Sequence, residues 1–215
     1  MKRVLQCAVM LAAALCLSSL PTWAGVVFND FGTGYNDICC TGWTVSGAAS
    51  GPGELIAANQ FTAAVSGNVS QIDLALTWVW GSGYATASLW TDVDGLPGAQ
   101  LGSGWNVKAT AKFGVECCDI ITIPGLTGPS LTAGQTYFML LLADNSTLDL
   151  WNWNNQGVNG LDVYSNDGGT TWTSQPGQPL GAFDILAATP EPASMLLLGA
   201  GLLCVLAGAR KRFVR

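Results

Sequence analysis

Four cysteines stand in two adjacent pairs, Cys39-Cys40 and Cys117-Cys118, and thiols in such pairs can bind zinc, act in redox chemistry or form disulfides. A zinc site usually needs Cys-x-x-Cys spacing or histidine, and the chain has neither. In an oxidising compartment the pattern favours one or two structural disulfides between the pairs, with vicinal bridges, redox activity and metal binding as alternatives. A disulfide that closes a loop of this length would stabilise the fold by about 4 kcal/mol.

Asp92 and Asp94 stand in "TDVDGLPG" just before a glycine, and two carboxylates in one turn can coordinate calcium. An EF-hand loop would need a third ligand at the next alternate position, a later glycine and a bidentate glutamate. Here Gly95 comes too early and Pro97 follows, so the pattern favours a polar hairpin turn. We therefore expect no metal or other cofactor, and Asp92 and Asp94 are the only candidate calcium ligands.

The stretch "LDLWNWNN" suggests a carbohydrate site. On a strand, its two leucines share one face, and Asp149, Trp151, Trp153 and Asn155 share the other. If the leucines point inward, the two tryptophans stand outward about 7 Å apart. Rings flanked by carboxylate and amide groups can stack on sugars and hydrogen-bond their hydroxyls. The alternative is a bulge that flips the register, or a loop that covers both rings.

The residues that common catalytic mechanisms require are missing from recognisable contexts. The chain has no histidine, which excludes His-based triads and general bases. No serine has a nucleophile-elbow context. The only glutamates of the body, Glu54 and Glu116, have no neighbours that mark an acid or a nucleophile for glycoside hydrolysis. We therefore expect that the protein is not an enzyme.

β-Strands would have to position these residues. "VSQIDLALTWVW" alternates, with Ile72, Leu74, Leu76, Trp78 and Trp80 on one face, which we assign to the core. "GYATASLWTD", "STLDLWNWNN", "LDVYS" and "GAFDILA" are typical of further strands, and "GQTYFMLLLAD" of a strand covered on both faces. Turn sequences rich in Gly and Pro separate them. The pattern predicts an all-β fold, an antiparallel β-sandwich with a jelly-roll-like arrangement.

The N-terminus is typical of a secretory signal peptide. Lys2 and Arg3 precede an apolar segment at 4–17, which ends in a small–x–small pattern that suits cleavage after Ala24. We therefore predict a signal peptide at 1–24, whose apolar segment forms a helix.

The C-terminus predicts a membrane helix at 193–209, which is 17 residues without a charge and is at the short limit for a span. Arg210, Lys211 and Arg212 follow at once, so the tail should stay cytoplasmic and the body should lie outside. The secreted domain would then be 25–188, and the C-terminal segment 189–215.

The charge of the chain is unevenly distributed. The net charge is −6 overall, but residues 25–189 keep only Lys108 and Lys112 against 13 Asp and Glu, which leaves −11. Such a body repels nucleic acid and anionic lipid, so we expect no nucleic-acid partner.

The segment "TPEPASMLLLGAGLLCVLAGARKR" resembles a PEP-CTERM sorting signal, also called an ice-binding-protein C-terminal domain. It has Pro190-Glu191-Pro192, a short apolar span and a basic cluster in that order. The resemblance implies an exosortase partner, which is a transpeptidase-like membrane protease of Gram-negative bacteria. It also implies a transient anchor in the inner membrane, removal of the tail, and delivery to the cell surface or extracellular matrix.

The body resembles choice-of-anchor type secreted β-sandwich domains; these have no assigned activity, so the likeness implies a fold and leaves the function open. The matching stretches are "ASLWTDVDGLPGAQLGS", "LTAGQTYFMLLL" and "SNDGGTTWT". We therefore expect an exported surface or matrix protein with a structural or adhesive role. One alternative is a carbohydrate-binding module that binds exopolysaccharide through Trp151 and Trp153. The second is a hydrolase of matrix polymer.

Overall fold

The computed structural model describes residues 24–34, 36–115 and 119–188. These residues contain thirteen β-strands and no helix, and Ala24–Ala188 forms one compact unit. The predicted signal helix and membrane helix lie outside the described ranges, and within those ranges no helix is long and apolar enough to span a membrane.

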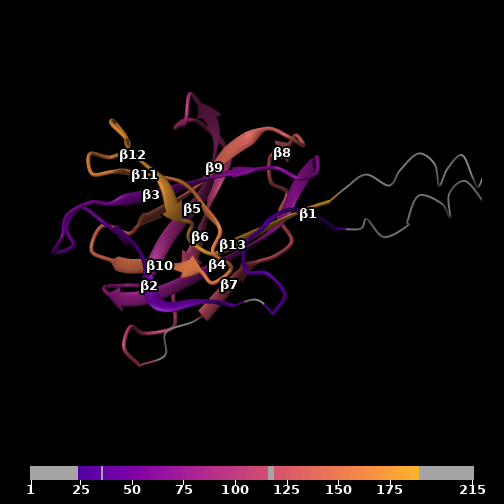
Figure 1. The fold of residues 1–215 in the computed structure, drawn as a ribbon. Helices are drawn as coiled ribbons and strands as arrows, with labels where there is room; N and C mark the ends of the chain where they lie inside the picture. The colour runs from indigo at the N-terminus through magenta and orange to yellow at the C-terminus, as the bar shows by residue number, and fades with distance from the viewer. Residues whose placement is uncertain (1–23, 35, 116–118, 189–215) are drawn as a thin grey trace, which may run out of the picture. The chain divides into compact units, whose positions relative to one another are not determined.

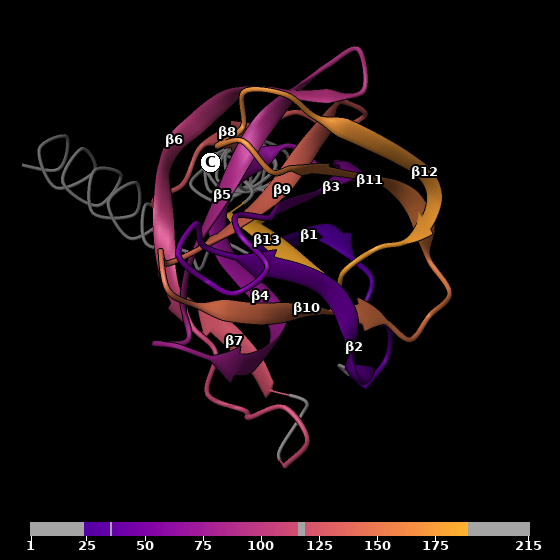
Figure 2. The ribbon, with the colours of Figure 1, turned by 90° about the vertical axis from the view of Figure 1, so that its left-hand side faces the viewer.

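The strands form two antiparallel sheets, which Figure 2 shows as two layers. The first sheet contains β1 (Ala24–Asn29), β2 (Asp37–Ser46), β4 (Gly67–Trp80), β7 (Asp119–Ile123), β8 (Ser130–Leu131), β10 (Leu148–Asn154) and β13 (Phe183–Ala188). The second contains β3 (Ile56–Thr62), β5 (Tyr84–Val93), β6 (Leu96–Lys108), β9 (Thr136–Ala143), β11 (Asn159–Ser165) and β12 (Thr173–Pro179). The predicted antiparallel sandwich is confirmed, whereas its jelly-roll connectivity stays a prediction.

The long strand β4 organises the first sheet (Figure 1). Leu74 lies between Phe183 of β13 and Ile121 of β7, and Leu76 lies between β10 and β7. Strands β13 and β10 therefore follow one another along the same edge of β4. Strand β2 pairs only with β10 among the described strands, so it forms an edge of this sheet. The second sheet runs in the order β12-β11-β3-β9-β5-β6, with β12 and β6 at its edges.

The main hydrophobic core lies between the sheets. Its fully buried side chains include Ile72, Leu74, Leu76, Leu89, Met139, Leu141, Trp151, Phe183 and Ile185. A smaller cluster covers the other face of the second sheet, with Phe138 and Leu140 of β9 packed near Val163. Both faces of β9 are thus covered, as its continuous apolar run predicted.

The assignment of both tryptophans of β4 to the core was wrong for Trp80. Trp78 packs against the main core while partly exposed, but Trp80 is 46% exposed. Trp80 is the last residue of β4, and burial decreases toward this end of the strand, from buried residues at 72–77 to half-buried ones at 78–79 and the exposed Trp80.

Candidate functional site

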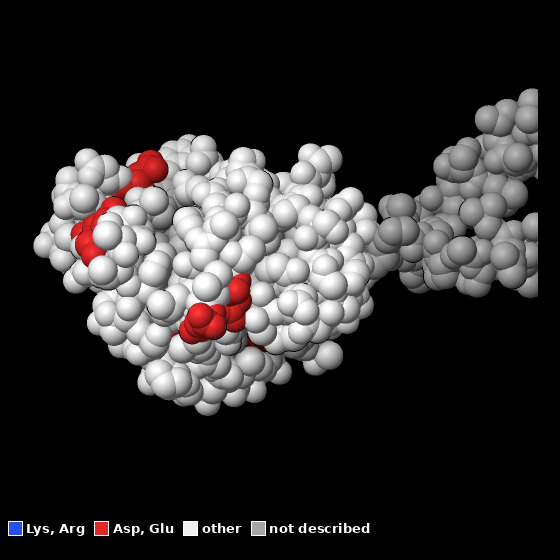
Figure 3. All heavy atoms as spheres, turned by 90° about the horizontal axis from the view of Figure 1, so that it is seen from above, with Lys and Arg blue, Asp and Glu red and all other residues white. Residues whose placement is uncertain are grey.

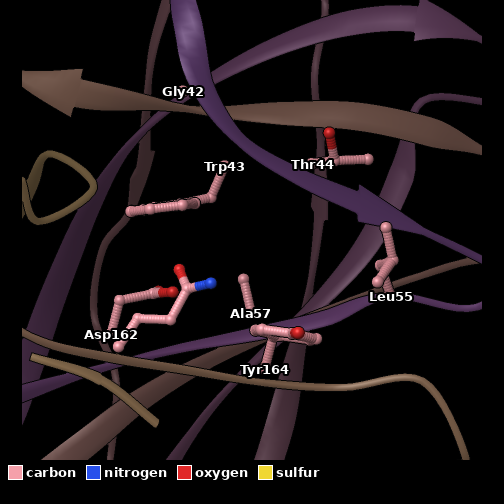
Figure 4. Close-up of a pocket in the computed structure, with 8 residues that line it drawn as sticks. Gly42, Trp43, Thr44, Leu55, Ala57, Asp162 and Tyr164 are labelled. Atoms are coloured by element: carbon pink, nitrogen blue, oxygen red, sulfur yellow. The ribbon is translucent and has the colours of Figure 1, made fainter. Parts of the chain in front are cut away.

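A pocket of about 330 Å³ opens between edge strand β2 of the first sheet and the β3–β11–β12 side of the second. Strand β2 brings Trp43 and Thr44 to one side, and Ala57, Asp162 and Tyr164 come from β3 and β11 on the opposite side (Figure 4). Gly42, Leu55 and Gln175 complete the lining. The pocket therefore draws its residues from both sheets.

The Trp43 ring is held by two contacts. Its indole N–H donates to the Pro179 carbonyl at 2.9 Å. The Trp153 ring meets it edge to face, with centroids 5.6 Å apart and an interplanar angle of 67°. Because the N–H is already used, the ring offers the pocket its apolar surface and no donor.

Asp162 forms the polar part of the opposite wall. It stands in register between Asn59 of β3 and Gln175 of β12, so these three side chains lie in a row across the sheet. Asn59 Nδ2 donates to Asp162 Oδ1 at 2.6 Å. Burial raises the pKa of Asp162 to about 7, and the hydrogen bond from Asn59 opposes that rise. Near neutral pH this carboxyl group can both accept and donate hydrogen bonds.

Several polar groups of the pocket have no hydrogen-bond partner among the described residues. They are Oδ2 of Asp162, the amide of Gln175 and the hydroxyl of Tyr164. Figure 4 shows the rings of Trp43 and Tyr164 on opposite walls, both nearly edge-on to the viewer. The arrangement is a slot with aromatic rings on opposite walls, and the carboxyl group of Asp162 and the amide of its cross-strand neighbour Gln175 form its most polar side.

The carbohydrate site predicted on β10 is not present as an exposed face. Asp149 and Trp151 are both 0% exposed, Trp153 is half-buried, and only Asn155 is exposed. Trp151 lies in the main core and donates its indole N–H to the Ala182 carbonyl at 3.1 Å. On β10 the ring of Trp151 points toward the second sheet, so Leu148 and Leu150 point to the opposite face and are only half-buried. A register shift between Asn152 and Trp153 then changes the alternation, as the alternative interpretation allowed.

Asp92 and Asp94 lie at the hairpin between β5 and β6. Asp92 accepts from Gln60 Nε2 at 2.6 Å and from the Gly95 backbone N–H at 2.8 Å, so both its carboxylate oxygens are already bonded. Asp94 and Gly95 have φ of 55° and 80°, as a two-residue type I′ turn requires. Among the described residues, no group of three or more His, Cys, Asp or Glu side chains is placed to hold a metal ion.

The cysteine pairs are only partly within the described residues. Cys40 lies on β2 and is disulfide-bonded. Cys117, Cys118 and the side chain of Cys39 lie outside the described part of the chain. The pairing between the two cysteine pairs therefore stays a prediction.

The acidic residues are less uniformly exposed than the net charge suggests. Five aspartates of the body are buried, namely Asp30, Asp73, Asp149, Asp162 and Asp184. On the face in Figure 3, the acidic side chains form separate patches surrounded by uncharged surface. Five of the 13 acidic side chains of the body therefore lie inside the sandwich and not at its surface.

Sequence reasoning missed Trp43, Asp162 and Gln175 as site residues. They come from β2, β11 and β12, and no single stretch of sequence contains them. A usable signal was the alternation within "LDVYS", which puts Asp162 and Tyr164 on the same face of a strand.

Residues 188–212 match the family model of the PEP-CTERM protein-sorting motif. The resemblance noted for this segment is thereby confirmed, and the motif implies exosortase-dependent sorting of an exported protein at the membrane. The model describes a sorting signal and not an enzyme family. No curated protein matches the chain.

Proposed function

We propose that the processed protein is a β-sandwich of the cell surface or extracellular matrix, with a structural or adhesive role. The observation that carries this proposal is the position of the sorting motif. The match begins at Ala188, which is also the last residue of β13. Cleavage beyond that residue would therefore release a body that keeps every strand of the described sandwich.

The N-terminal boundary is consistent with the same proposal. Strand β1 begins at Ala24 and pairs with β13 over most of its length. Cleavage of a signal peptide after Ala24 would leave Gly25 paired with Ala187, so the strand would lose a single residue. Both processing steps would thus act just outside the packed body, and the buried core would persist in the released form.

The sorting step is tested by Glu191→Ala in the native host. We expect the full-length chain to accumulate in the inner membrane, because the replaced glutamate is the charged centre of the Pro-Glu-Pro triplet. Glu54→Ala is the matched control, since Glu54 lies in the body, and it should be processed like the wild type. Normal processing of the Glu191 variant, or of the wild type in a strain without exosortase, would refute this route.

The role at the surface is tested separately by deleting the gene. We expect the deletion strain to form a weaker matrix or to attach less well, and the wild-type chain should restore this property while the Glu191→Ala variant should not. Unchanged matrix yield and attachment in the deletion strain would exclude the structural or adhesive role and leave the sorting route intact.

A further inference from the structure

We propose that the pocket between Trp43 of β2 and Asp162 of β11 binds one neutral pyranose ring of a polysaccharide. This inference rests on the proposed function, since a matrix protein with an adhesive role must contact a polymer. It differs from the site expected on β10, whose main ring, Trp151, is buried in the core.

The size of the pocket fits a single sugar ring. Small-molecule pockets span roughly 300–1,000 Å³, and this one, at about 330 Å³, is at the small end of that range. Its walls are side chains of two different sheets and include the edge strands β2 and β12, so a ligand would enter between these edges and be covered on two sides. A longer oligosaccharide would place one ring inside and the rest outside.

The walls of the pocket match the two kinds of surface that a pyranose ring presents. The C–H bonds of a sugar ring form an apolar face that packs on aromatic rings, and Trp43 and Tyr164 supply such rings on opposite walls (Figure 4). The hydroxyl groups around the ring edge need donors and acceptors. The free oxygen of Asp162 and the amide of Gln175 provide both at one side of the slot.

The side chains are held in place before any ligand arrives. Trp43 is fixed by the Pro179 carbonyl and by the edge of Trp153. Asp162 is fixed by Asn59, whose own Oδ1 accepts the backbone N–H of Gly181. Ordering of binding groups in advance reduces the entropic cost of binding, which matters most for small, weakly bound ligands.

The charge of the surroundings selects neutral sugars over acidic ones. None of the side chains that line the pocket is basic, and Asp162 carries a partial negative charge near neutral pH. The body has a formal charge of −11 over residues 25–189, and it stays negative even when the five buried aspartates are counted as neutral. A uronate or sulfated sugar would therefore meet repulsion with no compensating cation.

The experiment titrates the full chain with methyl hexosides of glucose, galactose and mannose, and with methyl glucuronide as the acidic counterpart. A zwitterionic detergent keeps sugar headgroups out of the sample, and calorimetry or saturation-transfer NMR measures binding. We expect at least one neutral hexoside to bind with a dissociation constant of about 1 mM, the scale for a ligand of this size. Tighter binding of the glucuronide, or no binding of any neutral hexoside, would overturn the proposal.

Three variants locate the site. Trp43→Ala should weaken binding at least about tenfold, and Gln175→Leu should weaken it about threefold or more, on the scale of one lost hydrogen bond. Trp80→Ala is the matched control, because Trp80 is a half-exposed tryptophan outside the pocket. This variant should bind the hexoside with the affinity of the wild type. If Trp43→Ala fails to fold, Gln175→Leu decides, since Gln175 lies on an edge strand.

If a folded Trp43→Ala protein binds the hexoside as tightly as the wild type, the sugar binds elsewhere and the proposal is overturned. If Trp43→Ala does not fold, a Gln175→Leu protein that binds as tightly as the wild type has the same consequence. The assay uses purified protein and does not depend on sorting. A chain that is processed normally but binds no hexoside would refute only the sugar site, whereas a chain that binds hexosides but is never processed would refute only the sorting route.

Discussion

The buried carboxyl group of Asp30 should make the protein less stable as the pH rises from acidic to neutral. Asp30 is 1% exposed; its Oδ1 accepts the Phe183 backbone N–H at 2.7 Å, and its Oδ2 has no partner among the described residues. Burial, with a smaller contribution from the charge of Asp184, raises the pKa of Asp30 to about 8. The folded protein therefore holds this proton over a range in which the unfolded chain has released it.

The magnitude follows from the linkage between protonation and folding. In the unfolded chain an aspartate has its ordinary pKa of about 3.9. Between that value and the folded pKa of about 8, the folded state binds one more proton than the unfolded state. The free energy of unfolding then falls by about 1.4 kcal/mol per pH unit. Asp30 alone should thus lower stability by about 2.7 kcal/mol between pH 5 and pH 7, which is a large fraction of the stability of a typical domain.

Urea unfolding at pH 5 and pH 7, monitored by tryptophan fluorescence, measures this effect in the wild type and in Asp30→Asn. The asparagine keeps an acceptor for the Phe183 N–H but cannot ionise, so its loss of stability over this interval should be smaller by about 2.7 kcal/mol. Asp94→Asn replaces an exposed carboxylate and should change stability with pH as the wild type does. If Asp30→Asn and the wild type lose equal stability, Asp30 is ionised in the fold and the reasoning is wrong.

Two further predictions concern the buried ring of Trp151. Trp151→Ala should cost about 3–5 kcal/mol in urea unfolding, because a large core side chain is lost, whereas Trp80→Ala should cost less than about 1 kcal/mol; equal costs would mean that Trp151 is not in the core. Gly181→Ala should lower the melting temperature, because its Cβ would lie 2.5 Å from the Trp151 ring. Trp151→Phe puts a smaller ring next to residue 181, so Gly181→Ala should lower the melting temperature less in that variant than in the wild type. If the two changes lower the melting temperature by the sum of their separate effects, the residue at 181 does not contact the Trp151 ring.

The strands that the sequence predicted are those with a clear apolar pattern. Each of the six expected stretches coincides with β4, β5, β9, β10, β11 or β13. Three of the strands that were not predicted, β2, β6 and β12, lie at sheet edges. Strand β12 has the sequence "TSQPGQP", with two prolines and a glycine, and β6 begins "LPGAQLGSG". Edge strands tolerate proline and glycine because one side of their backbone forms no hydrogen bonds with a neighbouring strand. The composition of β6 and β12 therefore gives no sign of a strand.

The orientation of β10 could not be derived from its own residues. Its two alternating sets both contain large apolar side chains, leucines in one and tryptophans in the other. Which set faces inward depends on the neighbours: Trp151 lies opposite Leu76 of β4, whose side chain is part of the main core. Local pattern therefore predicted the strand but left its two faces equivalent, and the packing of the second sheet decided between them.

The pocket lies where both sheets end, and this explains why it was hard to predict and why it is open. Edge strand β2 carries Trp43, and edge strand β12 carries Gln175, so neither wall has a further strand to cover it. Asn59 links this region to the first sheet, since it donates to Asp162 and accepts from the Gly181 N–H, next to the carbonyl that holds the Trp151 ring. The core tryptophan and the pocket carboxyl group are thus joined through one asparagine and two consecutive backbone residues. A substitution of Asn59 should therefore disturb both the position of Asp162 in the pocket and the packing around Trp151 in the core. The same side chain thus orders the pocket and stabilises the sandwich.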